Sequence, residues 1–383
     1  MPALPLLDAR GLKKAMGLFS VGRYRFDEWL SATAPLESTH PQFDCRRARP
    51  EEFDAIYDLV DESFVAARPR PLYDWLYRRN PYGLARCWVV VDRASGRLIG
   101  STASWPWPMA RGTEAIDGVL AGDWVIAPQW QRRGIAGLRA DVRRSHAWQD
   151  SLPALSWPNE KSRGSGRKRG RDVHILGPTP RAVLLLRTRD ILAARRWPAV
   201  LSAVGGGVGD GAVALWRAAA LGTRTRLTVE AVRRFDSSFD AVTERCMAWS
   251  RFWSPHGADF LNWRYFERPA AEYLAYAATD RDTIAGYYVL KVETAGAWLM
   301  EFVAPVQPRE VAVTLLLHAI RTAREAGCVL VRFSASSQWR HWPLFRRAGF
   351  LPTRSEIYLW PGGPDEANNL DAWQWTPGDM DDL

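Results

Sequence analysis

The clearest chemical signal in the sequence is a loop of small and basic residues that follows an apolar strand. Residues 123–137 read Asp-Trp-Val-Ile-Ala-Pro-Gln-Trp-Gln-Arg-Arg-Gly-Ile-Ala-Gly. Glycine and alanine allow a ligand to approach the backbone closely, and the first free amides of a helix bind anions. Arg132 and Arg133 add positive charge at that place. The loop therefore predicts a pyrophosphate site, and it lacks the Gly-Lys-Ser/Thr ending of magnesium-nucleotide loops.

This loop resembles the cofactor loop of the GNAT superfamily, the acyl-CoA-dependent N-acyltransferases. The pattern of that family is Gln/Arg-x-x-Gly-x-Gly/Ala, and Gln131-x-x-Gly134-x-Ala136 matches it. The resemblance implies that acetyl-CoA or another acyl-CoA binds as co-substrate, and it implies no metal. It further implies that the strand pairs with the pantetheine arm and that the loop holds the pyrophosphate. The residues so assigned are Trp124, Val125, Ile126, Gln131, Arg132, Arg133, Gly134, Ile135, Ala136 and Gly137.

A second point of resemblance lies in the next strand, which continues Leu155-Ser-Trp-Pro-Asn-Glu-Lys161. It looks like the Pro-Asn segment of GNAT proteins related to the tandem aminoglycoside-acetylating enzymes. Asn159 is therefore expected to bond the pantetheine or the substrate amide. The alternative is an asparagine that only shapes a turn after proline.

Two carboxylates are candidates for the base that accepts a proton from the attacking amine. Asp123 lies on the strand that would carry the thioester, and Glu160 follows the next strand. Partial burial raises the pKa of a carboxyl group and makes it a better base. For Asp123 the competing interpretation is a structural pair with a neighbouring arginine.

The apolar patterns fall into two blocks with the same order of elements. The first block predicts a strand at 43–47, a helix at 51–64, a hairpin at 87–105, a strand at 115–126, a helix at 134–148 and a strand at 154–157. The second predicts a strand at 227–235, a helix at 239–249, strands at 273–278, 283–292 and 297–303, a helix at 309–326, a strand at 329–333, a helix at 339–348 and a strand at 357–360. The aromatic segments 73–81 and 260–269, which both end in proline, occupy the same place in the two blocks. An internal repeat of about 190 residues is expected.

The expected fold class is α/β (α+β), with two tandem GNAT-like domains that each contain a mixed, mostly antiparallel sheet flanked by helices. The second copy departs from the family pattern, because its loop at 304–310 has two prolines and no glycine. Pro308 also lacks the amide that would face a phosphate, and Phe345 replaces the tyrosine that serves the family as general acid. We expect this copy to shape the substrate cleft without binding cofactor. The predicted boundaries are 1–40 for an N-terminal extension, 41–187 for the acyl-CoA-binding domain, 188–222 for a helical, glycine-rich linker, 223–362 for the degenerate domain and 363–383 for an acidic tail.

Composition excludes several classes of protein. The 383 residues are 47% hydrophobic and 24% charged, as in a soluble globular chain of two domains. Four scattered cysteines without a Cys-x-x-Cys pair exclude a disulfide scaffold and a cysteine-built zinc module. No secretory signal opens the chain, and no apolar stretch of about 20 residues is uninterrupted. We therefore expect no transmembrane segment and a cytoplasmic location.

The charge is unevenly distributed. The chain has a net charge of +9, but residues 361–383 hold six acidic residues and no basic one, so the first 360 residues carry +15. Such a surface attracts polyanions. However, the basic run 161–171 contains no aromatic residue on which bases would stack. Nucleic acid is therefore an unlikely partner, and the oligomeric state stays unknown.

The function expected is an N-acyltransferase, in the first place an N-acetyltransferase. It would move an acyl group directly from acyl-CoA to a primary amine of a small-molecule or carbohydrate-linked acceptor. One alternative is an aminoacyl-tRNA-dependent peptidyl-type transferase, which would not need the loop at 131–137. The other is a non-catalytic acyl-CoA-binding protein.

The acidic tail has two possible roles. In tandem aminoglycoside-acetylating enzymes the terminal segment returns to the first domain, and its carboxylate helps to deprotonate the acceptor. By its position the segment 373–383, with two tryptophans, is expected either to do the same or to be a solubilising tail that packs only locally.

Overall fold

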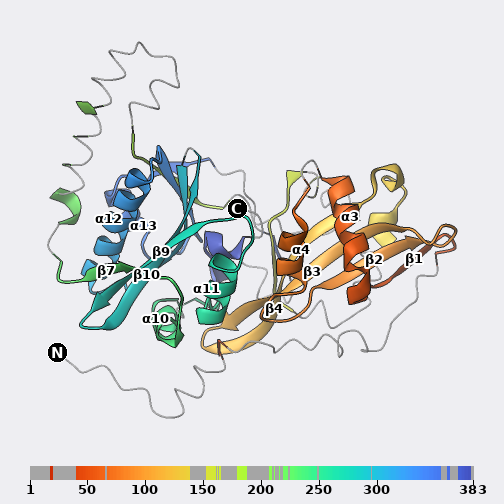
Figure 1. Ribbon diagram of the computed structural model, residues 1–383, viewed down its shortest axis with the longest axis horizontal. Helices are drawn as coiled ribbons and strands as arrows, with labels where there is room; N and C mark the ends of the chain where they lie inside the picture. Colours follow the sequence, from red (N-terminus) through yellow and green to blue (C-terminus); the bar gives the residue numbers. More distant parts are fainter. Residues whose placement is uncertain are drawn as a thin grey trace.

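The computed structural model describes residues 40–64, 67–138, 152–160, 179–187, 225–247, 250–294, 296–354, 360–362 and 370–380, together with a few isolated positions. These residues form two α/β units that lie side by side, each built on one mixed sheet (Figure 1). We call the unit on the first sheet the first half and the unit on the second sheet the second half.

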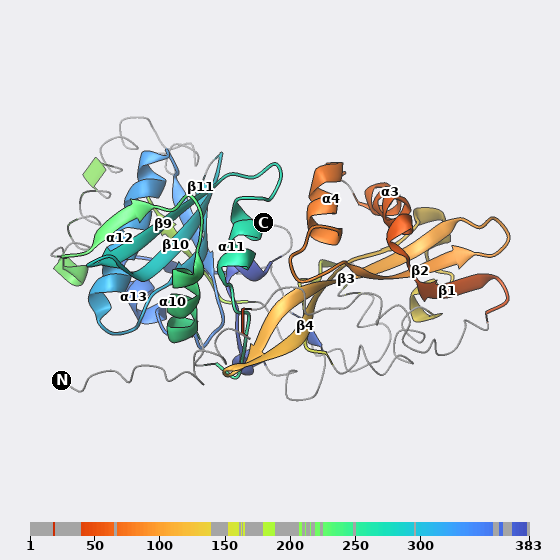
Figure 2. The ribbon, with the colours of Figure 1, turned by 60° about the horizontal axis from the view of Figure 1, so that its bottom comes forward.

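The first sheet has the strand order β1-β2-β3-β4-β5-β14. The strands are β1 (Phe43–Arg47), β2 (Arg86–Asp92), β3 (Leu98–Arg111), β4 (Glu114–Ile126), β5 (Ala154–Ser156) and β14 (Trp360–Gly362). Helices α3 (Phe53–Ser63) and α4 (Arg70–Tyr77) lie over one face of this sheet (Figure 2). The buried side chains of α3 recur every three or four residues, which is the pattern of a helix with one face on a core. The helix predicted there is confirmed.

The second sheet repeats this order with the strands β7-β9-β10-β11-β12-β6-β13. Their bounds are β7 (Thr228–Ala231), β9 (Tyr273–Asp280), β10 (Thr283–Glu293), β11 (Gly296–Val303), β12 (Leu330–Ser334), β6 (Arg181–Leu185) and β13 (Leu351–Thr353). The helices are α10 (Ser237–Met247), α11 (Ala258–Tyr265), α12 (Arg309–Glu325) and α13 (Trp342–Arg347). Along each path one pair is parallel, β4 with β5 and β11 with β12, and the other pairs are antiparallel. The mixed, mostly antiparallel sheets expected from the sequence are confirmed.

Two strands are exchanged between the halves. Strand β6 lies inside the segment 41–187, yet it pairs along its whole length with β12 of the second sheet. Strand β14 follows the second block along the chain, yet it pairs with β5 of the first sheet. Both occupy the same place in the two strand orders. The sheets therefore do not follow the predicted boundaries at these two strands, and the sequence pattern did not predict β6.

The contact between the halves is built around two tryptophans in equivalent places, Trp75 in α4 and Trp263 in α11. Their rings stack at a centroid distance of 4.3 Å with an interplanar angle of 14°. The indole N–H of Trp75 donates to the carbonyl oxygen of Trp263 at 2.9 Å, and the indole N–H of Trp263 donates to that of Trp75 at 3.2 Å. Each residue thus repeats its partner's contact, as a local two-fold axis requires. Figures 1 and 2 show α4 and α11 facing each other across the divide.

Substitution of Trp263 by alanine is expected to reduce the free energy of unfolding by about 3–5 kcal/mol, because a large buried ring is lost. Trp263→Phe keeps an aromatic ring but loses the hydrogen bond, so it is expected to lower the free energy of unfolding by less than Trp263→Ala does. Urea unfolding of the full chain measures both values. Equal unfolding free energies for the wild type and Trp263→Ala would contradict this account of the interface.

Candidate functional site

The predicted site begins where β4 and β5 separate. Within the described residues their last pair is Leu120 with Leu155, and β4 continues to Ile126. Strand β5 instead pairs on its other side with β14, where Ser156 meets Trp360. The carboxyl end of β4 therefore presents a strand edge that β5 does not cover, and the predicted residues 124–126 lie on it.

A bulge in β4 sets the direction of Asp123. Ala103 on β3 pairs with Gly122, whereas Ser101 pairs with Val125, so an extra residue is accommodated between these pairs. Asp123 has a φ of 45°, which places its backbone in the left-handed region. Bulges of this kind bend a strand and re-aim its side chains. Here the side chain of Asp123 is directed at α4 and is buried.

The carboxylate of Asp123 is fully engaged by a cation and a phenol. Nη1 of Arg68 donates to Oδ1 at 2.8 Å and to Oδ2 at 2.9 Å. The hydroxyl of Tyr77 donates to Oδ2 at 2.7 Å. Burial, and next the charge of Asp123, raises the pKa of Tyr77 well above its usual value, so the phenol stays protonated and remains a donor. Of the two interpretations of Asp123, this geometry favours the structural pair over the general base.

The loop after β4 is exposed and is attached to the end of the strand. The side-chain amide of Gln131 donates to the carbonyl oxygen of Ile126 at 3.1 Å. Gln131 thus closes the turn with its side chain, and its contribution to an anion site would come from its backbone. Arg132 has a φ of 65° and is exposed.

Gly134 leaves open space at the start of the helical residues. Its φ is 80°, and a Cβ added there would meet no atom within 4 Å. The guanidinium of Arg133 lies 4.7 Å from the ring centroid of Trp130. Ile135 is buried in a small cluster with strands β1 and β2, which anchors the loop to the sheet, while Ala136 and Gly137 are half-buried. Of the helix predicted for 134–148, the structure describes residues 135–138 as helical, and the remainder lies outside the described residues.

Asn159 and Glu160 lie on the other side of the strand separation. Both are exposed and follow β5 closely. The side-chain oxygen of Asn159 accepts a hydrogen bond from the backbone N–H of Ser162 at 2.9 Å. That bond is typical of an asparagine that shapes a turn.

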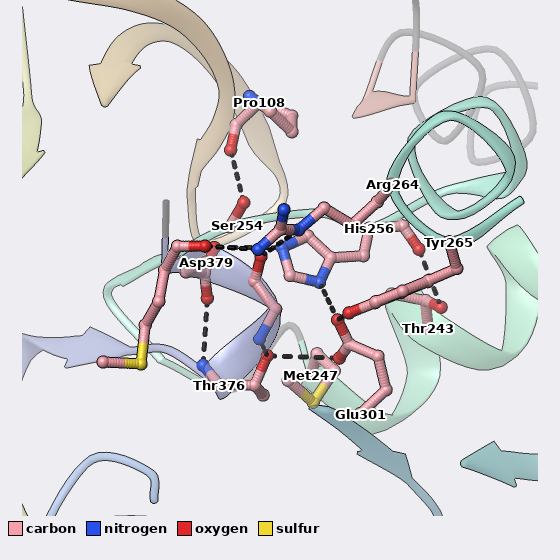
Figure 3. Close-up of polar contacts among 12 residues, drawn as sticks. Pro108, Thr243, Met247, Ser254, His256, Arg264, Tyr265, Glu301, Thr376 and Asp379 are labelled. Atoms are coloured by element: carbon pink, nitrogen blue, oxygen red, sulfur yellow. Dashed lines mark hydrogen bonds and ion pairs between the residues drawn. The ribbon is translucent and has the colours of Figure 1, made fainter. Parts of the chain in front are cut away.

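An ionic network that the sequence analysis missed lies between the halves (Figure 3). Glu301 on β11 is fully buried, and its Oε1 lies 2.7 Å from Nδ1 of His256. Tyr265 donates to the same oxygen at 2.6 Å, and Thr376 donates to Oε2 at 3.2 Å. Nε2 of His256 lies 2.9 Å from Oδ1 of Asp379. Burial alone would lower the pKa of His256, but the two carboxylates outweigh it and raise the pKa to about 10. His256 is therefore an imidazolium that donates to both acids.

The network fixes the acidic tail against both halves. From the first half, the indole N–H of Trp107 donates to Oδ1 of Asp379 at 3.2 Å. The indole N–H of Trp157 donates to the backbone carbonyl oxygen of Asp379 at 3.1 Å. Arg264, from the second half, donates to the carbonyl oxygens of Gly378, at 3.1 Å, and Met380. The short strand β15 (Trp373–Gln374) pairs with β8 (Phe252–Trp253). The solubilising-tail interpretation is therefore wrong for residues 373–380, while residues 381–383 lie outside the described part.

The same three-residue arrangement occurs in both halves. In each half a buried carboxylate lies on the strand that begins the parallel pair, β4 or β11. It is bound by a cation two residues before a helix, α4 or α11, and by a tyrosine within that helix. The two cations are 188 residues apart in the sequence, and so are the two tyrosines. The members are Arg68, Tyr77 and Asp123 in the first half and His256, Tyr265 and Glu301 in the second. A comparison of the aromatic segments extended five residues upstream would have aligned the two cations, but not the carboxylates.

Comparisons with known proteins decide the fold. No protein-family model matches the sequence, and no curated protein matches it. Among solved structures, a probable N-acyltransferase from Enterococcus faecalis V583 matches with a TM-score of 0.57 and 12% identity, over 83% of this chain and 72% of that chain. The chain has a GNAT-like acyltransferase fold. A GCN5-related N-acetyltransferase from Anabaena variabilis gives a TM-score of 0.57, 13% identity and the same coverage. Saccharomyces cerevisiae N-myristoyltransferase with bound myristoyl-CoA gives a TM-score of 0.54 and 11% identity, over 94% of this chain and 93% of that chain.

Two further observations concern the part of the chain that the structure describes. No group of three or more histidine, cysteine and acidic residues there is arranged to hold a metal ion. No described helix is both long and apolar enough to cross a membrane.

The docking of the tail is expected to weaken as the pH rises from about 6.5 to about 10. The folded-state pKa of His256 lies above its unfolded value of about 6.5, so its contribution is complete below that pH and is lost as the pH rises through about 10. Burial acts to raise the pKa of Asp379, but His256 and the hydrogen bonds hold it below its usual value, so the contribution of Asp379 is lost only in acid. The other charged or titratable groups described in contact with this network are Glu301, Tyr265 and Arg264, with the Tyr287 hydroxyl close to Glu301.

The measurement is urea unfolding of the full chain across this pH range, followed by tryptophan fluorescence. His256→Gln removes the titrating imidazole and is expected to flatten the profile. The same pH dependence in the wild type and the variant would contradict the assignment.

Proposed function

We propose that this protein is an acyl-CoA-dependent N-acyltransferase with its acyl-CoA site in the first half. The observation that carries the proposal is the edge of β4 that β5 does not cover within the described residues, which is followed directly by the open loop at Gly134. A pantetheine arm carries amides that pair with a strand edge as an added strand does. A pyrophosphate fits the first amides of a helix. The two features occur in the order in which these parts follow one another along coenzyme A.

The proposed contacts to coenzyme A are of two kinds, hydrogen bonds from the backbone and positive charge from arginine side chains. Residues 124–126 pair with the pantetheine through their backbone, and residues 131–137 surround the pyrophosphate. The exposed side chains of Arg132 and Arg133 add positive charge beside it. The open space at Gly134 supports this fit, because a side chain there would extend into the region assigned to the phosphates.

The proposed reaction is direct transfer. The amine nitrogen attacks the thioester carbonyl carbon, the carbon–sulfur bond breaks, the coenzyme A thiolate leaves, and the nitrogen loses a proton. Backbone amides near Ile126 polarise the carbonyl. Because Asp123 is occupied by Arg68 and Tyr77, we assign it to the shape of the β4 bulge. Glu160, exposed beyond β5, remains the candidate base, directly or through water.

The second half is proposed to be a degenerate copy of the same domain. Pro308 directly precedes α12 at the place where the first half has its glycine loop. Phe345 is fully buried and packs against Phe302, Phe333 and Trp339. It is a core residue with no proton to donate. We therefore propose that this half forms one wall of a cleft for a small-molecule or carbohydrate-linked amine, and that acetyl-CoA is the first donor to test.

Gly134→Asp is expected to weaken acetyl-CoA binding by well over tenfold, more than about 1.4 kcal/mol. The new carboxylate would occupy and repel the pyrophosphate position despite the helix dipole. Calorimetric titration measures the dissociation constant. Gly327→Asp is a matched control, because Gly327 has a φ of 84°, equally open surroundings and a place in the second half. Unchanged binding in a folded Gly134→Asp variant would overturn the site.

Catalysis is tested separately by thiol release from acetyl-CoA with a panel of primary amines. Turnover that falls in parallel with acetyl-CoA affinity in Gly134→Asp is the expected result. Tight acetyl-CoA binding without thiol release for any amine would instead identify a non-catalytic acyl-CoA-binding protein.

A further inference from the structure

We propose that Trp130 is a positioning residue of the acyl-CoA site, which holds the guanidinium of Arg133 where a phosphate group of coenzyme A binds. The inference rests on the proposed function, because it concerns how the same site obtains its affinity for phosphate. It is drawn from the contacts that Trp130 makes with the sheet on one side and with Arg133 on the other.

The indole of Trp130 is fixed against the first sheet. Its ring meets the ring of Phe43 edge to face, with the centroids 5.7 Å apart and an interplanar angle of 83°, which is a favourable geometry for an aromatic pair. Phe43 is buried and lies on β1, which pairs with β2 along its whole length. The backbone N–H of Trp130 donates to the carbonyl oxygen of Ala127 at 2.8 Å, within the short 3₁₀ helix Pro128–Trp130. The sheet therefore fixes this indole without any contribution from a ligand.

The turn after Trp130 brings Arg133 back over the same ring. Arg132 and Gly134, on either side of Arg133, have φ values of 65° and 80°. The guanidinium carbon of Arg133 lies 4.7 Å from the centroid of the Trp130 ring. This distance is typical of a cation–π interaction, for which tryptophan is the best of the aromatic side chains. The long, exposed side chain of Arg133 is thus given one preferred place.

An arginine held on a ring is well suited to bind phosphate. The contact with an indole uses the charge and the face of a guanidinium, whereas hydrogen bonds to phosphate oxygens use the N–H groups in its plane. One side chain can therefore make both contacts. Holding the side chain in advance also reduces the conformational entropy that is lost on binding. Arg133 directly precedes Gly134, whose open surroundings we assign to the pyrophosphate.

Two comparisons within the chain indicate that this role belongs to Trp130 and Arg133. Arg132 carries the same charge and is also exposed, but no aromatic ring contacts it within the described residues. The loop of the second half at 304–308 contains neither an aromatic residue nor a cation. The held arginine therefore occurs in the half to which we assign the coenzyme.

The test is a double-mutant cycle on acetyl-CoA binding, measured by calorimetric titration of the full chain. Trp130→Leu keeps an apolar side chain against Phe43 and removes the ring beneath Arg133. It is expected to weaken binding by about two- to fivefold, because the loss of an exposed cation–π contact lowers the population of the binding-competent conformer by that factor. Trp130→Phe retains an aromatic ring and is expected to bind acetyl-CoA more tightly than Trp130→Leu.

The arginine variants separate positioning from a general effect on the loop. In an Arg133→Gln background, Trp130→Leu is expected to cause no further loss of affinity, because no cation is left to be placed. Arg132→Gln is the matched control, and in that background Trp130→Leu is expected to cause the same loss as in the wild type. Circular dichroism establishes that each variant is folded.

Dephospho-acetyl-CoA, which lacks the 3′-phosphate, identifies the phosphate that Arg133 binds. An effect of Trp130→Leu that persists with this ligand assigns Arg133 to the pyrophosphate. An effect that is lost assigns it to the 3′-phosphate, and either result supports the positioning role.

The outcomes separate this inference from the proposed function. Failure of the wild type to bind acetyl-CoA would overturn the proposed function. Binding by the wild type that Trp130→Leu leaves unchanged would overturn the inference alone. A loss of the same size in the Arg133→Gln background would also overturn it, since Trp130 would then act on the loop as a whole.

Discussion

A buried carboxylate held by a tyrosine and a cation is the interaction on which each half of the molecule depends. Removal of the cation alone would leave a buried carboxylate without its charge partner, at a cost of about 3–5 kcal/mol. In the first half this interaction ties the bulge of β4 to α4 through Asp123. In the second half it ties β11 to α11 through Glu301. The bulge is thereby fixed just before the strand edge at which we place the thioester.

The cations of the two halves have different surroundings. The imidazolium of His256 is enclosed by Glu301 and Asp379, so the tail completes a closed network. The guanidinium of Arg68 holds Asp123 and stays partly exposed. The loops before the following helices differ as well. The first half has Gly134 with open space around it, and the second half has Pro308. We therefore propose the ligand site in the first half, whereas His256 in the second half is already bound by Glu301 and Asp379.

The exchange of β6 and β14 joins the two halves. Each half supplies a strand to its partner's sheet at the same position, so neither sheet is complete without the other. The stacked pair Trp75 and Trp263 then joins α4 to α11.

The sequence by itself predicted most of the helices and strands, though not β6, and it singled out the loop at 131–137, because each of these depends on residues close together in the chain. It also limited Asp123 to two interpretations. Only the tertiary structure shows the contact that favours one of them, the structural pair, since Arg68 and Asp123 are 55 residues apart. The sheet that takes β6 and the docking of Asp379 on His256, 123 residues away, likewise depend on pairing between distant segments. Local patterns specify which surfaces of an element are apolar, but hydrogen-bond and ionic partners are fixed only when the sheets and helices are assembled.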